Sequence, residues 1–142
     1  MHLQITPNWR ITLDKPYQRR IENDQLVLWT TGRTILMVVF RYQDARQREM
    51  MLAELKSKAA ATGLETLESQ QDAMVRIGYI QPEEISPGHV RLALHAFCAA
   101  ETTCLQSAFY FDIPADMPWA IQTWETIQYL NNKSPNPTTG AN

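Results

Sequence analysis

The run ILMVVF at residues 35–40 constrains the fold of this chain more than any other segment. Successive side chains of a strand point to opposite faces, and here both sets are apolar, so both faces of an expected strand over 34–42 need cover. Helices or a second sheet must supply that cover. The segment 25–30 is expected to form the preceding strand, joined to it by a tight turn in which Gly32 supplies the positive φ.

One segment with helical spacing lies directly after this hairpin. Over 44–62, Asp44 is positioned to cap the N-terminus and Gly63 to close the C-terminus. At helical spacing, the expected buried face consists of Met51, Leu52, Leu55, Ala59 and Thr62. The sequence therefore predicts a helix that covers one side of the sheet.

A second helix is expected near the end of the chain, over 116–132. Asp116 is its expected cap, and Pro118 lies in the first turn, where a missing N–H costs little. The apolar arc is too broad for a solvated helix and must be largely buried. The arc contains Met117, Ala120, Ile121, Trp124 and Ile127, with Trp119 and Leu130 at its margin.

The other segments read as strands and loops. Residues 9–13 alternate as a strand, and 14–24 are expected to be a polar loop. Four further strands are expected at 64–69, 73–80, 90–100 and 104–113. The resulting order, βββαββββα, predicts an α+β fold: a single twisted antiparallel sheet of six or seven strands with two helices packed on it. We expect one globular domain over 1–130 and a polar tail over 131–142.

The two cysteines raise the question of a disulfide. Apolar residues occupy even positions in the strand that contains Cys98 and odd positions in the strand that begins at Cys104. Antiparallel partners share a face, so a hairpin that keeps both apolar sets in the core places Cys98 opposite Leu105. The same register places Cys104 opposite Ala99. The thiols then point to opposite faces, and a disulfide requires a register slip or a bulge. We expect Cys98 in the core and Cys104 as a half-exposed thiol.

A catalytic set could be drawn from His95, Cys104 and Asp112, which share the other face of this expected hairpin. A thiol, a base and a carboxylate are the parts of a nucleophilic enzyme. Neither a nucleophile elbow nor a Gly-rich oxyanion loop accompanies them, so no catalytic residue is assigned. His95 and Cys98 point to opposite faces, and no CxxC or HxxxH pair occurs. We therefore expect no metal ligand and no cofactor.

Charge and hydropathy restrict the partners. Thirteen basic and fifteen acidic side chains give a net charge of −2, which provides no long-range attraction for nucleic acid or anionic lipid. No window approaches the roughly 20 apolar residues of a spanning helix, and the N-terminus lacks the pattern of a secretory signal. Two cysteines fit a reducing compartment. We expect a cytoplasmic protein without a nucleic-acid or membrane partner.

The order of elements resembles a known superfamily. The hairpin QLVLWTTGRTILMVVFRY, the helix at 44–62, the run of antiparallel strands and the closing segment PADMPWAIQTWETIQYL are similar to the PsbP-like and Mog-like small α/β/α proteins. This group includes the bacterial DcrB-type proteins and the effector-associated chaperones of type VI secretion. The resemblance covers most of 9–130 and implies a non-enzymatic adaptor, assembly factor or chaperone. It carries over no site residue.

Together these observations predict a non-catalytic protein-binding module, a bacterial accessory protein such as an effector chaperone, an immunity protein or an adaptor. The partner is expected to be another protein, such as a secreted effector or toxin, and a homodimer is a further possibility. Aromatic side chains at a rim are typical of such surfaces. The expected contact residues are Trp119, Tyr129, Tyr110 and Arg91.

Two alternatives remain open at this point. One is a small thiol-dependent or hydrolase-like enzyme that uses His95, Cys104 and Asp112. The other is a small-ligand-binding domain whose pocket lies between the sheet and the helix that carries Trp124.

Overall fold

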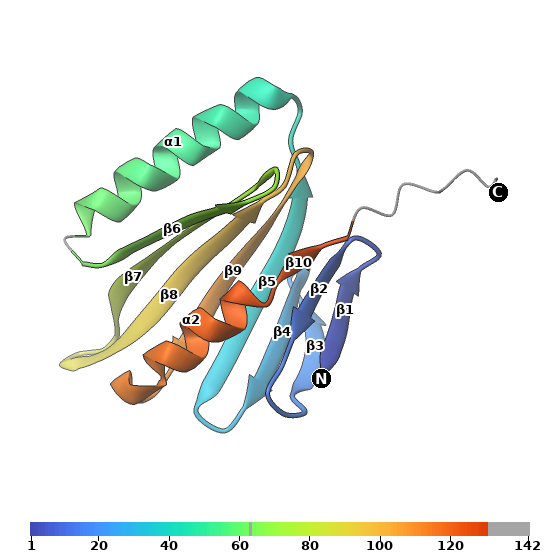
Figure 1. Cartoon of the computed structure of the whole chain (residues 1–142). Coiled ribbons are helices and arrows are strands. Elements are labelled where there is room, and N and C mark those ends of the chain that lie inside the picture. Colours follow the sequence, from blue (N-terminus) through green and yellow to red (C-terminus); the bar gives the residue numbers. More distant parts are fainter. Residues whose placement is uncertain (63, 131–142) are drawn as a thin grey trace.

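The chain folds around a seven-stranded antiparallel sheet (Figure 1). The computed structural model describes residues 1–62 and 64–130, so Gly63 and the predicted tail at 131–142 lie outside the described residues. The strands in spatial order are β3 (Gln18–Glu22), β4 (Gln25–Thr30), β5 (Arg33–Arg41), β9 (Thr103–Phe111), β8 (His89–Ala99), β7 (Met74–Ser86) and β6 (Thr66–Gln71). The predicted α+β class, an antiparallel sheet with two helices packed on it, is confirmed. The expectation of a single sheet is wrong: the strand predicted at 9–13 lies in a second sheet, and β3 takes its place among the seven.

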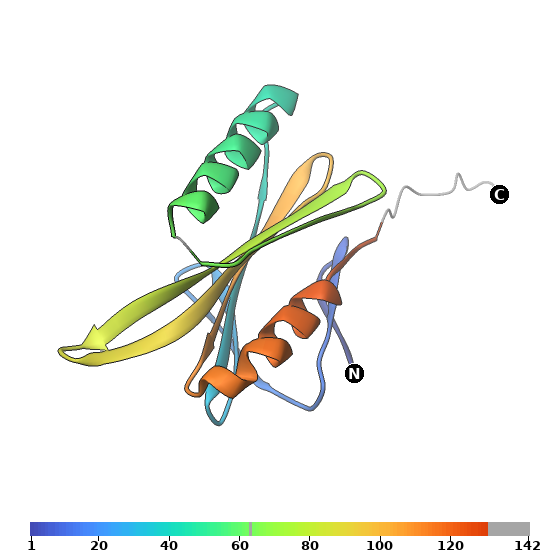
Figure 2. The same ribbon diagram turned by 60° about the vertical axis from the view of Figure 1, so that its left-hand side comes forward.

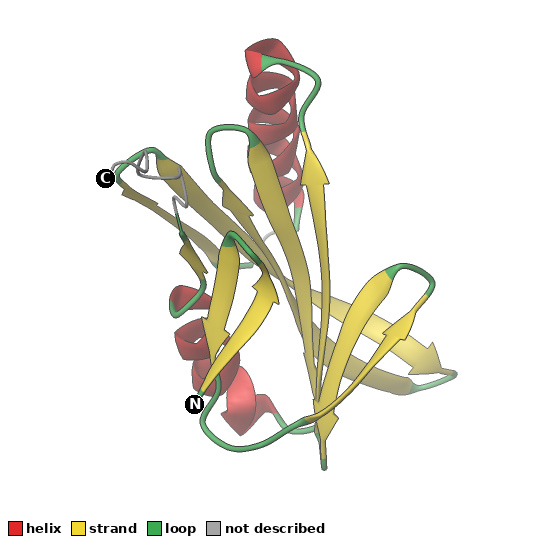
Figure 3. Cartoon of the chain, turned by 90° about the vertical axis from the view of Figure 1, so that its right-hand side faces the viewer, coloured by secondary structure: helices red, strands yellow, loops and turns green. Residues whose placement is uncertain are grey.

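A second, three-stranded sheet joins the two ends of the described chain (Figure 3). It consists of β1 (His2–Thr6), β2 (Trp9–Thr12) and β10 (Gln128–Tyr129), with β2 in the middle. The strand predicted at 9–13 is confirmed as β2, with Trp9 and Ile11 buried. It pairs within this second sheet, however, and β1 and β10 were not predicted. Both are short strands at sheet edges, which give a weak sequence pattern.

The two helices, α1 (Ala45–Ala61) and α2 (Met117–Glu125), lie on opposite faces of the seven-stranded sheet (Figure 2). α2 and the small sheet cover one face and enclose the larger core, which includes Trp9, Phe109 and Trp124. α1 covers part of the other face, over a smaller core that includes Leu55 and Phe97. Neither helix is long and apolar enough to cross a membrane.

The predicted helix over 44–62 is confirmed as α1. The carboxylate of Asp44 accepts the backbone N–H of Gln47 at 2.8 Å, which caps the N-terminus as expected. Its buried side chains all belong to the predicted face: Leu52, Leu55 and Ala59. Burial of these three side chains, rather than a strongly apolar stripe, fixes which side of α1 meets the sheet.

A guanidinium group fastens the first turns of α1 to the sheet. Arg48 donates from Nε to the carbonyl of Ala100 at 2.8 Å. Its Nη2 donates to the carbonyls of Ala73 at 3.0 Å and Ala99 at 3.1 Å. These carbonyls lie at the β6–β7 and β8–β9 turns, so one side chain connects the start of α1 to both turns.

α2 ends earlier than the predicted helix over 116–132. Arg76 of β7 binds the carbonyls of Glu125 and Ile127, and residues 128–129 pair with β2. These contacts take the backbone out of the helix after Glu125. Asp116 occupies the N-cap position without capping, because its carboxylate binds Arg33 at 3.0 and 3.2 Å instead.

The polar loop predicted at 14–24 contains the edge strand β3. All five of its residues are exposed, so it lacks the apolar alternation that reveals a strand. Asn23 and Asp24 form the two-residue turn to β4, with φ of 52° and 63°. Asn and Asp tolerate this left-handed region, and two such residues in sequence are typical of a hairpin turn.

β7 runs beyond the predicted end at 80 to Ser86, through Pro82 and Glu83. β6 pairs with β7 only as far as Tyr79, so the rest of β7 is an edge strand, where a proline is tolerated. The far end of the β7–β8 hairpin projects beyond both helices (Figure 2).

The predicted β8–β9 register is confirmed. Cys98 lies opposite Leu105 and Cys104 opposite Ala99. The two cysteines are free, and each is packed in a different core, on opposite faces of the sheet. The expectation of a half-exposed Cys104 is wrong: its side chain is fully buried because α1 covers this part of the sheet.

Candidate functional site

The candidate site lies on the outer face, by which we mean the face of the seven-stranded sheet on which α1 packs. The core beneath α1 takes its sheet residues mainly from β7 and β8. On the central strand β5, Leu36 and Val38 point to the outer face, are partly exposed and belong to neither core. Both faces of this strand were predicted to be covered, but α1 covers the outer face only in part.

Strand register assembles an aromatic hollow on this face. Thr34 lies opposite Trp29 on one side and opposite Tyr110 on the other, so a small residue is placed between two rings. The two ring-bearing strands are two spacings apart, or roughly 10 Å. The hollow has a volume of about 300 Å³, and its lining includes Trp29, Thr34, Tyr110 and two arginines, Arg20 and Arg91.

An arginine guanidinium group is stacked on each aromatic ring of the hollow. The Arg20 Cζ lies 4.6 Å from the ring centroid of Trp29. The Arg91 Cζ lies 4.5 Å from the ring centroid of Tyr110. A guanidinium stacked on a ring is attracted to its π face and keeps its N–H groups for an acceptor in its own plane. Thus the hollow combines apolar walls with donors for an anion.

Arg91 has no carboxylate partner in the described part of the chain. Its cross-strand neighbour is Glu83, but the Glu83 carboxylate binds His95 instead, with 2.8 Å between Oε2 and Nε2. The Nε of Arg91 is buried and has no hydrogen-bond partner. Such a donor costs stability until an acceptor reaches it.

A second hollow, of about 750 Å³, lies beside the first and extends beneath the C-terminal end of α1. The His95 ring stacks on Tyr79, with 5.4 Å between ring centroids, and meets Tyr110 edge-on at 6.4 Å. Burial is the main cause that raises the pKa of both tyrosines above the usual value. The phenols therefore stay neutral and act as hydrogen-bonding groups on this face.

The structure does not bring together His95, Cys104 and Asp112, the set considered as catalytic. His95 lies opposite Ala108, which is four residues from Cys104 in one direction and four from Asp112 in the other. At about 3.3 Å per residue, each lies roughly 13 Å along the strand from His95, far beyond hydrogen-bond reach. The three residues of the predicted set therefore do not form one site in the structure. Burial also raises the pKa of the Cys104 thiol to about 12, so the group is protonated at neutral pH.

The four predicted contact residues fall into two groups. Tyr110 and Arg91 lie together in the aromatic hollow. Trp119 lies on the other side of the sheet in the larger core, 8% exposed, with its ring packed against Phe109. It is buried, not at a rim, because α2 turns this side chain toward β9. Tyr129 lies in β10 and packs edge-on against Trp9, also away from the outer face.

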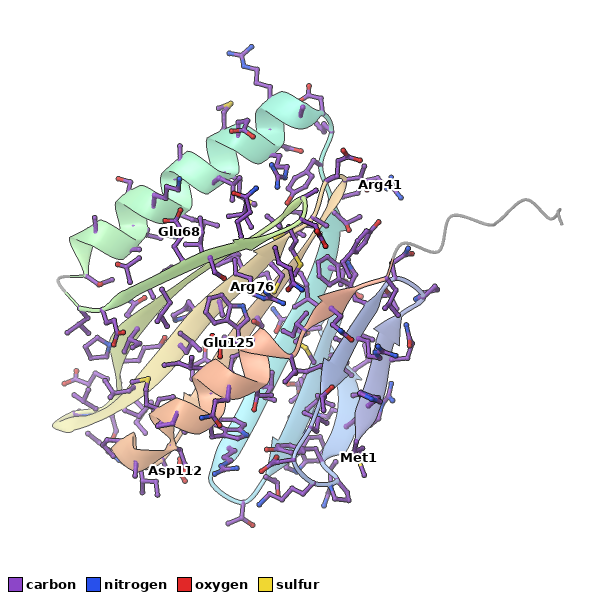
Figure 4. The ribbon with its side chains drawn as sticks, in the orientation of Figure 1. Met1, Arg41, Glu68, Arg76, Asp112 and Glu125 are labelled. Atoms are coloured by element: carbon purple, nitrogen blue, oxygen red, sulfur yellow. The ribbon has the colours of Figure 1, made fainter. Side chains whose placement is uncertain are left out.

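One alternative placed a ligand pocket between the sheet and the helix that carries Trp124. In the structure, the buried indole of Trp124 occupies this space and packs on Gly78. The hollow closest to this place has a volume of about 420 Å³ and opens beside β10, where its lining includes Arg76 and Tyr129. Figure 4 shows Arg76 next to the C-terminal end of α2, close to Glu125. Arg76 is 6% exposed and donates to backbone carbonyls of this segment, a structural role.

Sequence reasoning missed Arg20, Trp29, Leu36 and Val38 as members of the site. Arg20 lay in the expected loop, so its strand position was hidden. The signal for Leu36 and Val38 was present, since the run at 35–40 is apolar on both faces.

Within the ranges 1–62 and 64–130, no group of three or more His, Cys, Asp and Glu side chains is placed to hold a metal ion. The chain matches no protein-family model, and a search of curated proteins finds no relative.

Proposed function

We propose that this chain is a non-catalytic protein-binding module, an accessory protein of the bacterial cytoplasm such as an effector chaperone, an immunity protein or an adaptor. The outer face is its contact surface, and the partner is another protein. This function agrees with the resemblance to the PsbP-like and Mog-like proteins. The members of that group that bear on this chain are non-enzymatic adaptors, assembly factors or chaperones.

The incomplete cover of β5 is the observation that carries the proposal. Leu36 and Val38 occupy the middle of the sheet, are partly exposed and pack against neither core. Contiguous apolar side chains left in contact with water are typical of a surface that a partner buries.

The composition of the outer face also supports protein binding. Trp29 and Tyr110 flank β5, and an arginine side chain is stacked on the ring of each. Tyr, Trp and Arg are the side chains enriched at the energetic centres of protein interfaces. Partly buried aromatic rings beside apolar strand residues provide the area that such a centre needs.

A capture experiment with matched variants tests this proposal. The tagged full-length chain is incubated with lysate of the source cell, and bound proteins are quantified by mass spectrometry. Val38→Glu places a charge in the middle of the outer face. Val90→Glu makes the same change at the exposed tip of the β7–β8 hairpin, where Val90 is 54% exposed.

We expect Val38→Glu to lower recovery of a stoichiometric partner by about tenfold, because the new charge must be desolvated in the interface. Val90→Glu should leave recovery unchanged. Both variants must retain the melting temperature of the parent chain within a few degrees. Equal recovery with both variants would exclude the outer face. Sedimentation would reveal a homodimer that Val38→Glu dissociates, and that outcome would assign the face to self-association instead.

A further inference from the structure

The aromatic hollow has a charge that the apolar part of the outer face lacks. We infer that it binds a carboxylate side chain, Asp or Glu, from an acidic segment of the partner protein, held between the guanidinium groups of Arg20 and Arg91. This inference rests on the proposed protein-binding function and specifies the chemistry of the partner.

The first support is the unused donor capacity of Arg91. Glu83, the carboxylate across the strand pair, is bound to His95, and no ion pair in the described residues includes Arg91. A partly buried guanidinium whose Nε has no acceptor gains most from an acceptor that carries a negative charge.

The second support is the position of Arg20 across the hollow. Among residues 1–62 and 64–130, its only ion pair is with Glu22, at 3.4 Å, and both side chains are about half exposed, 51% and 54%. Exposed pairs of this kind contribute little, so a ligand carboxylate competes for Arg20 at small cost.

The remaining charges of the lining leave a net positive site. Arg33 contributes to the lining, but its guanidinium binds Asp14 and Asp116 and stacks on Trp119, on the other side of the sheet. In the described part of the chain, Asp112 is the one carboxylate of the lining, and a Cβ atom at Gly32 would lie 3.7 Å from its Oδ2. Arg91, which has no ion pair among the described residues, and Arg20, which has only the exposed pair with Glu22, therefore face this one carboxylate.

The shape of the hollow favours a side chain on an extended segment. The hollow exceeds the volume of a single amino-acid side chain, and its floor, Thr34, lies in line with the apolar stripe of Leu36 and Val38 on the same strand. A segment that alternates acidic and apolar residues can place one type in the hollow and the other on the stripe.

The test uses the full-length chain and a short fluorescein-labelled peptide that alternates Glu with Leu. A second peptide has Gln in place of every Glu. Fluorescence anisotropy gives the dissociation constants, and the Nε–Hε resonances of the arginines in ¹H–¹⁵N spectra report which side chains are contacted.

We expect the Glu peptide to bind about tenfold more tightly than the Gln peptide, because charge-assisted hydrogen bonds are the stronger class. Arg91→Gln should remove about the same factor. Arg19→Gln is the matched control, because Arg19 lies next to Arg20 on the opposite face of β3 and its substitution makes the same change of charge. It should leave the affinity unchanged.

The peptide results separate the carboxylate site from the wider protein-binding surface. Equal binding of the two peptides, weakened by Val38→Glu, would overturn the carboxylate site and leave the outer face as a protein-binding surface. Lack of binding by the Glu peptide, or equal weakening by Arg19→Gln and Arg91→Gln, would also overturn the inference. Displacement of the peptide by inorganic phosphate at comparable affinity would reassign the hollow to a free oxyanion.

Discussion

The indole ring of Trp124 lies directly on the backbone of Gly78. A Cβ atom at Gly78 would be 2.9 Å from Cη2 of the ring and 3.0 Å from Cζ3, closer than side chains pack. The glycine in the middle of β7 therefore allows α2 to approach the sheet, and the tryptophan that it accommodates is 2% exposed.

Replacement of this glycine is expected to destabilise the protein through overpacking. Gly78→Ala should lower the free energy of unfolding by about 1–3 kcal/mol, because the ring cannot move without disturbing the larger core. Urea unfolding of Gly78→Ala, Trp124→Phe and the double variant measures the coupling. The cost of Gly78→Ala should be smaller in the Phe background. An unchanged cost would show that the ring is not what the new methyl group meets.

Arg76 is expected to stabilise the segment that follows α2. Its Nη2 donates to the carbonyl of Ile127 at 2.7 Å, and its Nη1 donates to Oε1 of Gln71 at 3.2 Å. Arg76→Met should cost about 3 kcal/mol, since buried carbonyls lose a charged donor. Arg10→Met is the control, because Arg10 is bonded to Gln128 on the surface and should cost less than about 1 kcal/mol. Similar losses for the two variants in urea unfolding would contradict this role.

The two thiols are expected to be unreactive in the folded chain. Burial raises the pKa of Cys98 to about 11 and that of Cys104 to about 12, so almost no thiolate is present at neutral pH. Iodoacetamide should modify neither cysteine in native buffer and both in guanidinium chloride, as followed by intact mass. Rapid modification of the native protein at Cys104 would mean that α1 does not cover this thiol as described.

Acid stability is expected to depend on the contact between Arg33 and Asp116. The guanidinium of Arg33 holds the pKa of Asp116 below its ordinary value of 3.8. The folded state thus binds the proton less readily than the unfolded state. The stabilisation is present above about pH 4 and is lost as the pH falls through the folded-state pKa.

Asp116→Asn should therefore flatten the decline of the unfolding free energy below about pH 4, whereas the parent chain retains the decline. Asp24→Asn is the control, since no ion pair in the described residues includes Asp24 and Asn tolerates its φ of 63°. The measurement is a series of urea titrations across the acid range. An identical pH profile for the parent and Asp116→Asn would exclude the contribution of this pair.

Sequence reasoning succeeded where hydrophobic phase and local capping determine the structure. The opposite phases of the apolar residues in β8 and β9 fixed the position of Cys98 opposite Leu105. The cap of α1 by Asp44 was equally local, because a carboxylate and an N–H three residues later decide it.

It failed where a distant partner decides the structure. Nothing near Gln128 and Tyr129 reveals that they leave the helix, because their pairing residues lie in β2 at the other end of the chain. Trp119 was predicted to lie at a rim for a similar reason. Helical spacing gives the width of the apolar face of α2, but it does not show which part of that face packs against the sheet. The aromatic hollow required the strand order, which sets Trp29 and Tyr110 on either side of β5.

The attachment of α1 by Arg48 has a consequence for the order in which the fold opens. The hydrogen bonds of Arg48 hold the first turns of α1. The rest of the helix is held by its three buried side chains and by an exposed ion pair between Lys56 and Glu68, which contributes little. Hydrogen exchange should therefore begin at the C-terminal end of α1, with the Arg48 end as the hinge. The end that lifts first borders the hollow at His95, through Lys58 and Ala61. Breathing of one helix would thus enlarge the outer face without disturbing the core around Trp124.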